Sequence, residues 1–194
     1  ALGLGLVAAL LRVSRLAPLR WLGTVHVEIF RNAPDYIMVV WVHFVLPLLI
    51  GLLLHTRLEF NPYLSSILAL GFVYSGYFAE TFRAGIEAIP KGQVEAADSL
   101  GLTYWQTQRK IVLPQALAMV VPGIMNNFIS IFKDTSLVTI VSLYELTGSL
   151  GLALNSDADW RPFKIEGYLF ITLIYFIFCF AMSRYSLWVE KQLN

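Results

Sequence analysis

Long apolar runs alternate with shorter polar segments along this chain of 194 residues. Four runs approach the roughly 17–25 residues that a helix needs to cross a bilayer; they are residues 36–54, 63–82, 111–132 and 167–183. Backbone groups in lipid must pair within their own segment, so each run is expected to be a helix. Residues 1–11 are also apolar, and we interpret them as a truncated spanning helix because Arg12 and Arg15 follow the run, whereas a signal peptide has its basic residues first. The pattern predicts an all-α, polytopic membrane protein with about five transmembrane helices.

Composition agrees with a membrane location. Hydrophobic residues make up 57% of the chain and charged residues only 14%, whereas soluble domains average roughly 45–50% and 25%. The formal net charge is +1, so the charge balance gives no reason to expect a nucleic-acid partner. A single cysteine, Cys179, lies within an apolar run, which excludes an internal disulfide bond.

Basic residues collect in alternate polar segments. Segments 12–35, 83–110 and 184–194 hold most of them, whereas segments 55–62 and 147–166 together hold only Arg57, Arg161 and Lys164. Cytoplasmic loops of membrane proteins carry the excess of Lys and Arg. The distribution therefore predicts that the three basic segments, including the C-terminus, are cytoplasmic.

The region 111–146 is interrupted by prolines and polar residues. Pro114 and Pro122 each remove a backbone hydrogen bond. The polar stretch 133–136 divides the region into a full span and a short apolar piece, residues 137–146, which we interpret as a half-helix or a segment at the outer face. Charged groups at membrane depth are costly and belong where the backbone faces protein or a water-filled cavity.

The predicted cytoplasmic segment between the third and fourth spans carries its own helix signals. Pro90 suits the first turn of a helix, residues 95–100 are mostly good helix formers, and Gly101 is the residue type that ends a helix in the left-handed conformation. Thr103 and Gln106 match a capping box that begins a second helix. We predict a short helix, a sharp glycine turn and a second helix that continues into the membrane.

This segment and its surroundings resemble a known family. Glu95-Ala96-Ala97, followed by Gly101 and by Ile111-Val112-Leu113-Pro114, resembles the EAA loop of permease subunits of binding-protein-dependent ABC importers. Residues 30–34, 77–86 and 132–137 resemble the polar amino-acid branch of that family. Residues 166–168 and 182–188 resemble permeases of general L-amino-acid systems. The resemblance covers nearly the whole chain, and the sequence departs from many relatives at Asp35 and Tyr36.

The resemblance implies a single transmembrane permease domain over residues 1–194, with a coupling loop near residues 84–110. The loop helix would dock on an ATPase subunit through the coupling residues Glu95, Ala96, Ala97 and Gly101. No phosphate-binding G-x-x-x-x-G-K-[ST] pattern occurs in the sequence, so ATP and Mg²⁺ would be bound by the partner ATPase, and this chain would carry no cofactor.

The resemblance also implies the other partners and the location. They are a second permease subunit, related or identical, two ATP-binding subunits and a soluble extracytoplasmic amino-acid-binding protein. The complex would lie in the bacterial inner membrane, with this chain crossing it several times, and would import amino acids by alternating access driven by ATP.

Charged residues at the helix break are the first candidates for the substrate pathway. Lys133 and Asp134 either contact the charged groups of an amino acid or form an ion pair that holds the break together. Thr135 and Ser136 either bind a ligand carboxylate or cap the following short helix through their hydroxyl groups.

The third span supplies the other pathway candidates. Tyr74, Ser75 and Tyr77 give it a polar stripe that either lines the pathway or packs between helices. Glu80 shares a helix face with Arg83, which favours a structural pair near the inner gate over substrate contact. His43 in the second span either lines the pathway or bonds a backbone carbonyl. Asn126 and Asn127 are expected to form hydrogen bonds between helices.

The sequence offers no basis for an intrinsic enzyme. It has no Cys/His cluster with metal-ligand spacing, and no pattern of nucleophile, base and orienting residue. We therefore predict a transport subunit without catalytic or metal-binding residues. The alternative is a channel or secondary carrier for small polar solutes that needs no ATPase.

Overall fold

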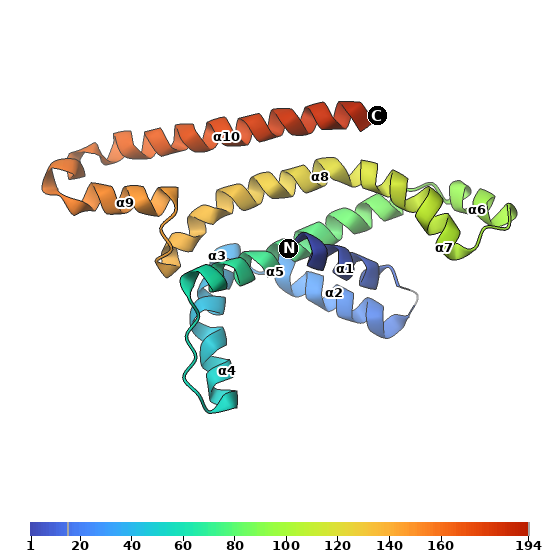
Figure 1. Ribbon diagram of the computed structural model, residues 1–194, viewed down its shortest axis with the longest axis horizontal. Coiled ribbons are helices and arrows are strands. Elements are labelled where there is room, and N and C mark those ends of the chain that lie inside the picture. Colours follow the sequence, from blue (N-terminus) through green and yellow to red (C-terminus); the bar gives the residue numbers. More distant parts are fainter. Residues whose placement is uncertain (15, 194) are drawn as a thin grey trace. The chain divides into compact units, whose positions relative to one another are not determined.

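The computed structural model describes residues 1–14 and 16–193, and Arg15, one of the basic residues used to predict orientation, lies outside them. Helices α1 to α10 follow one another along the chain, and no strand occurs among the described residues (Figure 1), which confirms the all-α prediction. The α-helices cover Leu2–Arg12 (α1), Ala17–Asn32 (α2), Asp35–Val40 (α3), Leu46–Leu54 (α4), Pro62–Glu87 (α5), Lys91–Ser99 (α6), Tyr104–Thr107 (α7), Leu113–Asp134 (α8), Leu146–Ser156 (α9) and Lys164–Leu193 (α10).

These helices form two compact units, each with its own packing. Unit 1 contains α1, α2, the second part of α5, α6, α7, most of α8 and the end of α10. Unit 2 contains α3, α4, the first part of α5, the end of α8, α9 and most of α10. The single permease domain over residues 1–194 stays a prediction.

Three helical stretches in the described part of the chain are long and apolar enough to cross a membrane. They are Asp35–Leu54, Tyr104–Val141 and Ala158–Gln192, and they contain three of the four predicted full-length spans. The first predicted span corresponds to the short apolar helix α1. The remaining predicted span, residues 63–82, lies within α5, which is long enough but less apolar. The count of five spans therefore stays a prediction.

Packing explains why α5 is less apolar than the other long helices. Ser65 and Ser75 of α5 are completely buried, and each is hydrogen-bonded to a histidine. His43 Nδ1 lies 2.8 Å from Ser65 Oγ, and His26 Nε2 lies 2.7 Å from Ser75 Oγ. Small polar residues that hydrogen-bond between helices are typical of helix contacts within membrane proteins. The surface of α5 therefore contacts protein over much of its length.

Two prolines coincide with local changes of helix type. A π-helical turn, Trp41–Val45, directly precedes α4, which has Pro47 in its first turn. A second π-helical turn, Gln108–Val112, precedes Pro114 at the start of α8. Proline lacks an N–H and its ring crowds the carbonyl four residues earlier, and a π turn gives that carbonyl room. The helix continues through both prolines for this reason.

The core of unit 1 depends on close approach between α5 and α8. A Cβ atom at Gly123 of α8 would lie 2.7 Å from Cγ2 of Thr81 on α5, so only glycine fits there without a shift. One turn later, the Asn127 amide donates to Thr81 Oγ1 at 3.1 Å. This bond confirms the prediction that Asn127 joins two helices.

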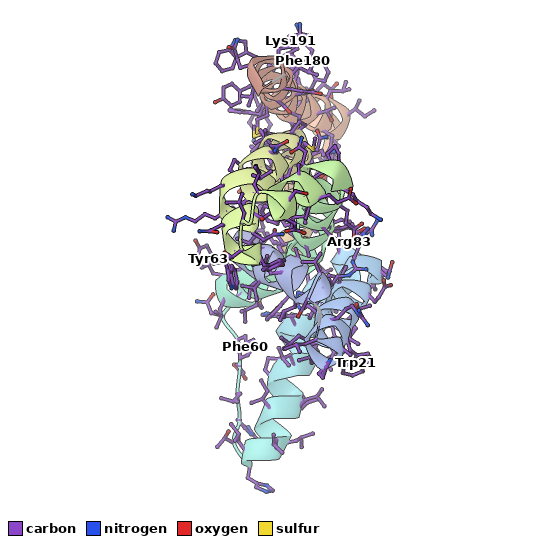
Figure 2. All side chains as sticks on the ribbon, turned by 90° about the vertical axis from the view of Figure 1, so that its right-hand side faces the viewer. Trp21, Phe60, Tyr63, Arg83, Phe180 and Lys191 are labelled. Atoms are coloured by element: carbon purple, nitrogen blue, oxygen red, sulfur yellow. The ribbon has the colours of Figure 1, made fainter. Side chains whose placement is uncertain are left out.

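Unit 2 has a separate apolar core. It consists of buried residues from α3, the adjoining π turn, α5 and the 3-10 helix Thr135–Val141: Val39, Val42, Ala69, Val138 and Val141. The long helix α10 instead exposes apolar side chains around much of its surface; Phe180 is 55% exposed and points away from the helix axis (Figure 2). An apolar helix exposed on many sides is typical of contact with lipid or with other membrane helices.

Candidate functional site

The predicted helix-turn-helix forms between α5 and α8, within unit 1 (Figure 1). Helix α6 ends at Ser99, and Gly101 follows with φ of +75°. The Leu102 N–H donates to the Ala97 carbonyl at 3.1 Å, and the Gly101 N–H donates to the Asp98 carbonyl at 3.0 Å. This pair of bonds is a Schellman helix ending, in which glycine takes the left-handed conformation without steric cost. Gly101 therefore determines the geometry of the turn.

The beginnings of α6 and α7 are also capped. Thr103 and Gln106 form the predicted capping box, with the Thr103 N–H donating to Gln106 Oε1 at 2.8 Å and the Gln106 N–H donating to Thr103 Oγ1 at 3.4 Å. Pro90 lies at the N-cap of α6, one position before the predicted first turn, where its carbonyl accepts the Gln93 N–H at 3.0 Å. Both helix starts are therefore specified by local residues.

Tertiary contacts hold this helix-turn-helix against the start of α8. Ile89, Val112 and Ala116 form a buried apolar cluster, with Ile86 and Val94 packed on it. The Gln115 side-chain amide on α8 donates to Gln93 Oε1 on α6 at 2.6 Å. Helix α6 is therefore held against α8 by packed side chains as well as by the connecting chain.

The predicted coupling residues lie on α6 and in the turn after it, and they differ in exposure. Ala97 is buried, whereas Glu95, Ala96 and Gly101 are exposed. The turn also exposes two large apolar side chains that the sequence analysis did not select: Leu100 is 81% exposed and Trp105 is 78% exposed. Exposed apolar groups rimmed by polar residues are typical of protein interaction sites. The sequence signal that could have identified this surface is the pair of large apolar residues on each side of the helix-ending glycine.

A cavity of about 470 Å³ lies in unit 1, between α5 and α8 and beside the end of α2. Its volume is in the range of small-molecule sites. Two predicted pathway residues, Tyr77 and Glu80, line it. The polar lining is completed by Arg31, Thr81 and Asn127, and the rest is apolar or glycine.

Glu80 is the centre of a charge network beside this cavity. Its carboxylate accepts a hydrogen bond of 2.6 Å from Arg12 Nη1 on α1 and further bonds from Arg83, three residues along α5. Arg83 also pairs with Glu87. Hydrogen bonds to Glu80 and then to Glu87 raise the pKa of Arg83 above its usual range, so it stays charged. The predicted structural pair of Glu80 and Arg83 is confirmed, and Arg12 and Arg31 extend it.

The four candidates at the helix break lie in unit 2. Helix α8 ends at Asp134, as predicted, and continues as the 3-10 helix Thr135–Val141. The Asp134 carboxyl lies beside the Asp35 carboxyl on α3. The Thr135 hydroxyl donates to the Phe132 carbonyl at 2.7 Å, which favours its structural role at the helix end. Lys133 is exposed and Ser136 is half-buried.

Glu145 was missed in the sequence, although it joins three elements of unit 2. Its carboxylate accepts bonds of 2.9 Å from the Thr147 and Gly148 N–H groups at the start of α9. It also accepts bonds of 2.9 Å from the hydroxyl groups of Thr139 and Tyr175, which lie on the 3-10 helix and on α10. The sequence signal was an acidic residue at the N-cap of a helix.

Replacing Glu145 by alanine is expected to lower the free energy of unfolding by about 2–3 kcal/mol, because a cap and two further hydrogen bonds are lost. Thermal unfolding in detergent measures this change. Asp157 is the matched control: it caps the 3-10 helix Ala158–Phe163 through one exposed bond of 3.2 Å, and Asp157→Ala should cost about 0.5–1 kcal/mol. Equal losses in the two variants would contradict the role of Glu145.

The stability due to Glu145 should also depend on pH. Burial raises the pKa of Glu145, but hydrogen bonds from two backbone N–H groups and two hydroxyl groups lower it by more. The pKa of Glu145 therefore lies below the ordinary value. The contribution is therefore complete above the unfolded pKa of about 4.3 and is lost as the pH falls through the lower folded pKa. The stability gap between the natural chain and Glu145→Ala should be constant from about pH 7 to 5 and should shrink below about pH 4. A gap that persists at low pH would contradict this assignment.

The helical architecture and the apolar helices define a multi-pass membrane protein. All of residues 1–194 match the model of the binding-protein-dependent transport system inner membrane component family. The chain belongs to this family of transport proteins.

Several curated proteins are similar to this chain over nearly its full length. The inner membrane amino-acid ABC transporter permease protein YhdY of Escherichia coli is 41% identical over 100% of this chain, which covers 52% of YhdY. The glutamate/glutamine/aspartate/asparagine transport system permease protein BztC of Rhodobacter capsulatus is 38% identical over 100% of this chain and 44% of BztC. The chain thus spans about half the length of these two relatives. It covers 83% of the probable glutamine ABC transporter permease protein GlnM of Bacillus subtilis, at 33% identity over 98% of this chain.

Solved structures show the same fold. A chain from the crystal structure of an amino acid ABC transporter with histidines superposes with a TM-score of 0.87, at 28% identity, over 98% of this chain and 84% of that chain. A chain from the inward-facing MetNI methionine ABC transporter superposes with a TM-score of 0.66, at 22% identity, over 97% of this chain and 85% of that chain. At that identity the second likeness concerns the fold alone.

Proposed function

We propose that this chain is the transmembrane subunit of an ATP-driven importer of polar amino acids. Its family membership and its similarity to amino-acid permeases support a transport role. The observation that carries the proposal is the rigid helix-turn-helix of α6 and α7, which presents Glu95, Leu100 and Trp105 on its surface while it is packed onto α8.

The helix-turn-helix serves as the docking element for a separate ATPase in this proposal. The partner binds ATP and Mg²⁺, and its closure pushes on the surface formed by Glu95 and Ala96 of α6 and by Gly101 in the turn that follows. The bond between Gln93 and Gln115 and the apolar cluster beneath α6 support transmission of this movement to α8. Two such ATPases act on a pair of permease subunits, and a soluble binding protein delivers the amino acid.

Orientation follows from the distribution of basic residues. The helix-turn-helix and the C-terminal end of α10 lie on the cytoplasmic side of the bacterial inner membrane, and α9 lies on the opposite side. The amino acid passes the cavity in unit 1, where Tyr77 and Glu80 are found. Asp134 and its neighbours Lys133, Thr135 and Ser136 remain candidate contacts at the helix break.

Reconstitution tests this function. The full natural chain, co-purified with its ATPase and permease partners, is placed in liposomes with the binding protein outside and ATP inside. We expect uptake of glutamate or glutamine that requires ATP and stops when ATP is replaced by a non-hydrolysable analogue. Uptake that is driven by an ion gradient in the absence of the ATPase would contradict the proposal and would favour a secondary carrier. Comparing Asp134→Ala with the natural chain for an acidic, a neutral and a basic amino acid tests the candidate contact at the helix break.

A further inference from the structure

Arg31 and Glu80 are the two charged residues that line the cavity of unit 1, and they differ in how far their charges are already neutralised. Both Glu80 oxygens are engaged, because Arg12 binds Oε2 at 2.6 Å and Arg83 donates to both oxygens. Additional ligands therefore find little of the Glu80 carboxylate available.

Arg31 has much weaker contact with the same carboxylate. Arg31 Nη1 lies 3.8 Å from Glu80 Oε2, which is beyond hydrogen-bond length, and the Arg31 side chain is 46% exposed. By comparison, the Arg12 side chain is 17% exposed. The guanidinium of Arg31 thus keeps its donors available on the side of the cavity.

The charges of the network do not balance. Three arginines, Arg12, Arg31 and Arg83, accompany two carboxylates, Glu80 and Glu87. The excess positive charge falls to Arg31, since the other two arginines are held by direct hydrogen bonds. A guanidinium with free donors binds a carboxylate in a planar, two-bond arrangement.

Gly76 determines where Arg31 lies. A Cβ atom at Gly76 on α5 would lie 3.1 Å from the Arg31 backbone nitrogen and 3.3 Å from Arg31 Cβ. The end of α2 therefore rests directly on α5 at this glycine. Because the backbone of Arg31 is held so closely, its side chain is presented to the cavity from a defined position.

We propose that Arg31 binds the carboxylate of an amino acid in this cavity and favours acidic and neutral amino acids over cationic ones. The inference rests on the proposed transport function and assigns a specificity-determining residue within it. Tyr77, Thr81 and Asn127 surround the site with neutral polar groups suited to the rest of the ligand. A lysine side chain would meet the excess positive charge of the network, whereas a second carboxylate would be attracted by it.

The test measures equilibrium binding of amino acids to the purified permease–ATPase complex. The binding protein is left out, so that its own specificity does not contribute to the measured affinity. Radiolabelled L-glutamate, L-glutamine and L-lysine are the probes. The natural complex should bind glutamate and glutamine more tightly than lysine. Arg31→Gln should raise the Kd for glutamate and glutamine about tenfold, as expected for a lost charge-assisted pair, and should leave or improve the binding of lysine.

Arg20→Gln is the matched control, because it removes the same charge from an exposed position of α2 outside the cavity, and its Kd values should equal those of the natural complex. Arg31→Lys keeps the positive charge beside Glu80, so it provides the same test if Arg31→Gln does not assemble; its Kd for glutamate should rise about threefold.

Three results would overturn the inference: Kd values for glutamate within twofold of the natural complex in both Arg31 variants, lysine binding as tight as glutamate binding in the natural complex, or no amino-acid binding by a complex that transports. A complex that shows no ATP-dependent uptake at all would instead contradict the proposed transport function.

Discussion

Replacing Gly101 by valine is expected to reduce ATP-driven uptake by about tenfold or more. Valine is strongly disfavoured at φ of +75°, at a local cost of roughly 1–3 kcal/mol, so the turn between α6 and α7 should rearrange to a different backbone path. That rearrangement displaces Leu100 and Trp105 from the surface on which we propose that the ATPase docks. Uptake by reconstituted complexes and the amount of ATPase that co-purifies with the chain measure the effect.

Gly92→Val is the matched control for this change. Gly92 lies in α6, the short helix that precedes the turn at Gly101, and beyond the adjoining chain no atom lies within 4 Å of a Cβ atom built at either glycine. The two substitutions therefore add the same side chain in open space and differ in the backbone conformation that receives it. Uptake should be retained in Gly92→Val. Equal losses in both variants, or full uptake in Gly101→Val, would show that the left-handed turn is not required.

Replacing Glu80 by glutamine is expected to lower the free energy of unfolding by about 2–4 kcal/mol. The substitution leaves Arg12, Arg31 and Arg83 close together without their shared carboxylate, in a site where the Glu80 side chain is only 23% exposed. Removing one partner from a largely buried ion-pair network costs far more than removing one from an exposed pair. Thermal unfolding of the purified chain in detergent measures the loss.

Glu87→Gln provides the comparison, because Glu87 has one arginine partner and its side chain is 56% exposed. Its effect should be at most about 1 kcal/mol. If Glu80→Gln and Glu87→Gln were equally stable, the network around Glu80 would not contribute to folding. Raised salt should also weaken the exposed pair with Glu87 more than the bonds to Glu80.

Local chemistry allowed the helix-turn-helix to be predicted closely. A glycine that ends a helix and a capping box that begins the next one act over three to six residues, so Gly101, Thr103 and Gln106 were readable before any tertiary contact was known. The break at Asp134 was readable for a similar reason, since a charged and hydroxyl-rich stretch interrupts an apolar run.

Contacts between residues far apart in the sequence could not be predicted in the same way. Glu80 and Arg83 are three residues apart on one helix, and their pair was predicted. Arg12 is 68 residues from Glu80, and its contact depends on how α1 packs against α5. Likewise, Asp134 was considered beside its neighbour Lys133, whereas in the structure its carboxyl contacts that of Asp35 on α3.

The sequence by itself determined that the chain is helical, that it belongs in a membrane and where its short exposed helix turns, because hydrophobic length and helix capping are properties of continuous segments. Only the tertiary structure decided which charges meet, which serines are buried and where the cavity with Arg31 and Glu80 forms. Those features arise when separate helices approach one another, and the order of residues along one helix shows which side chains share a face but not which neighbour will cover that face.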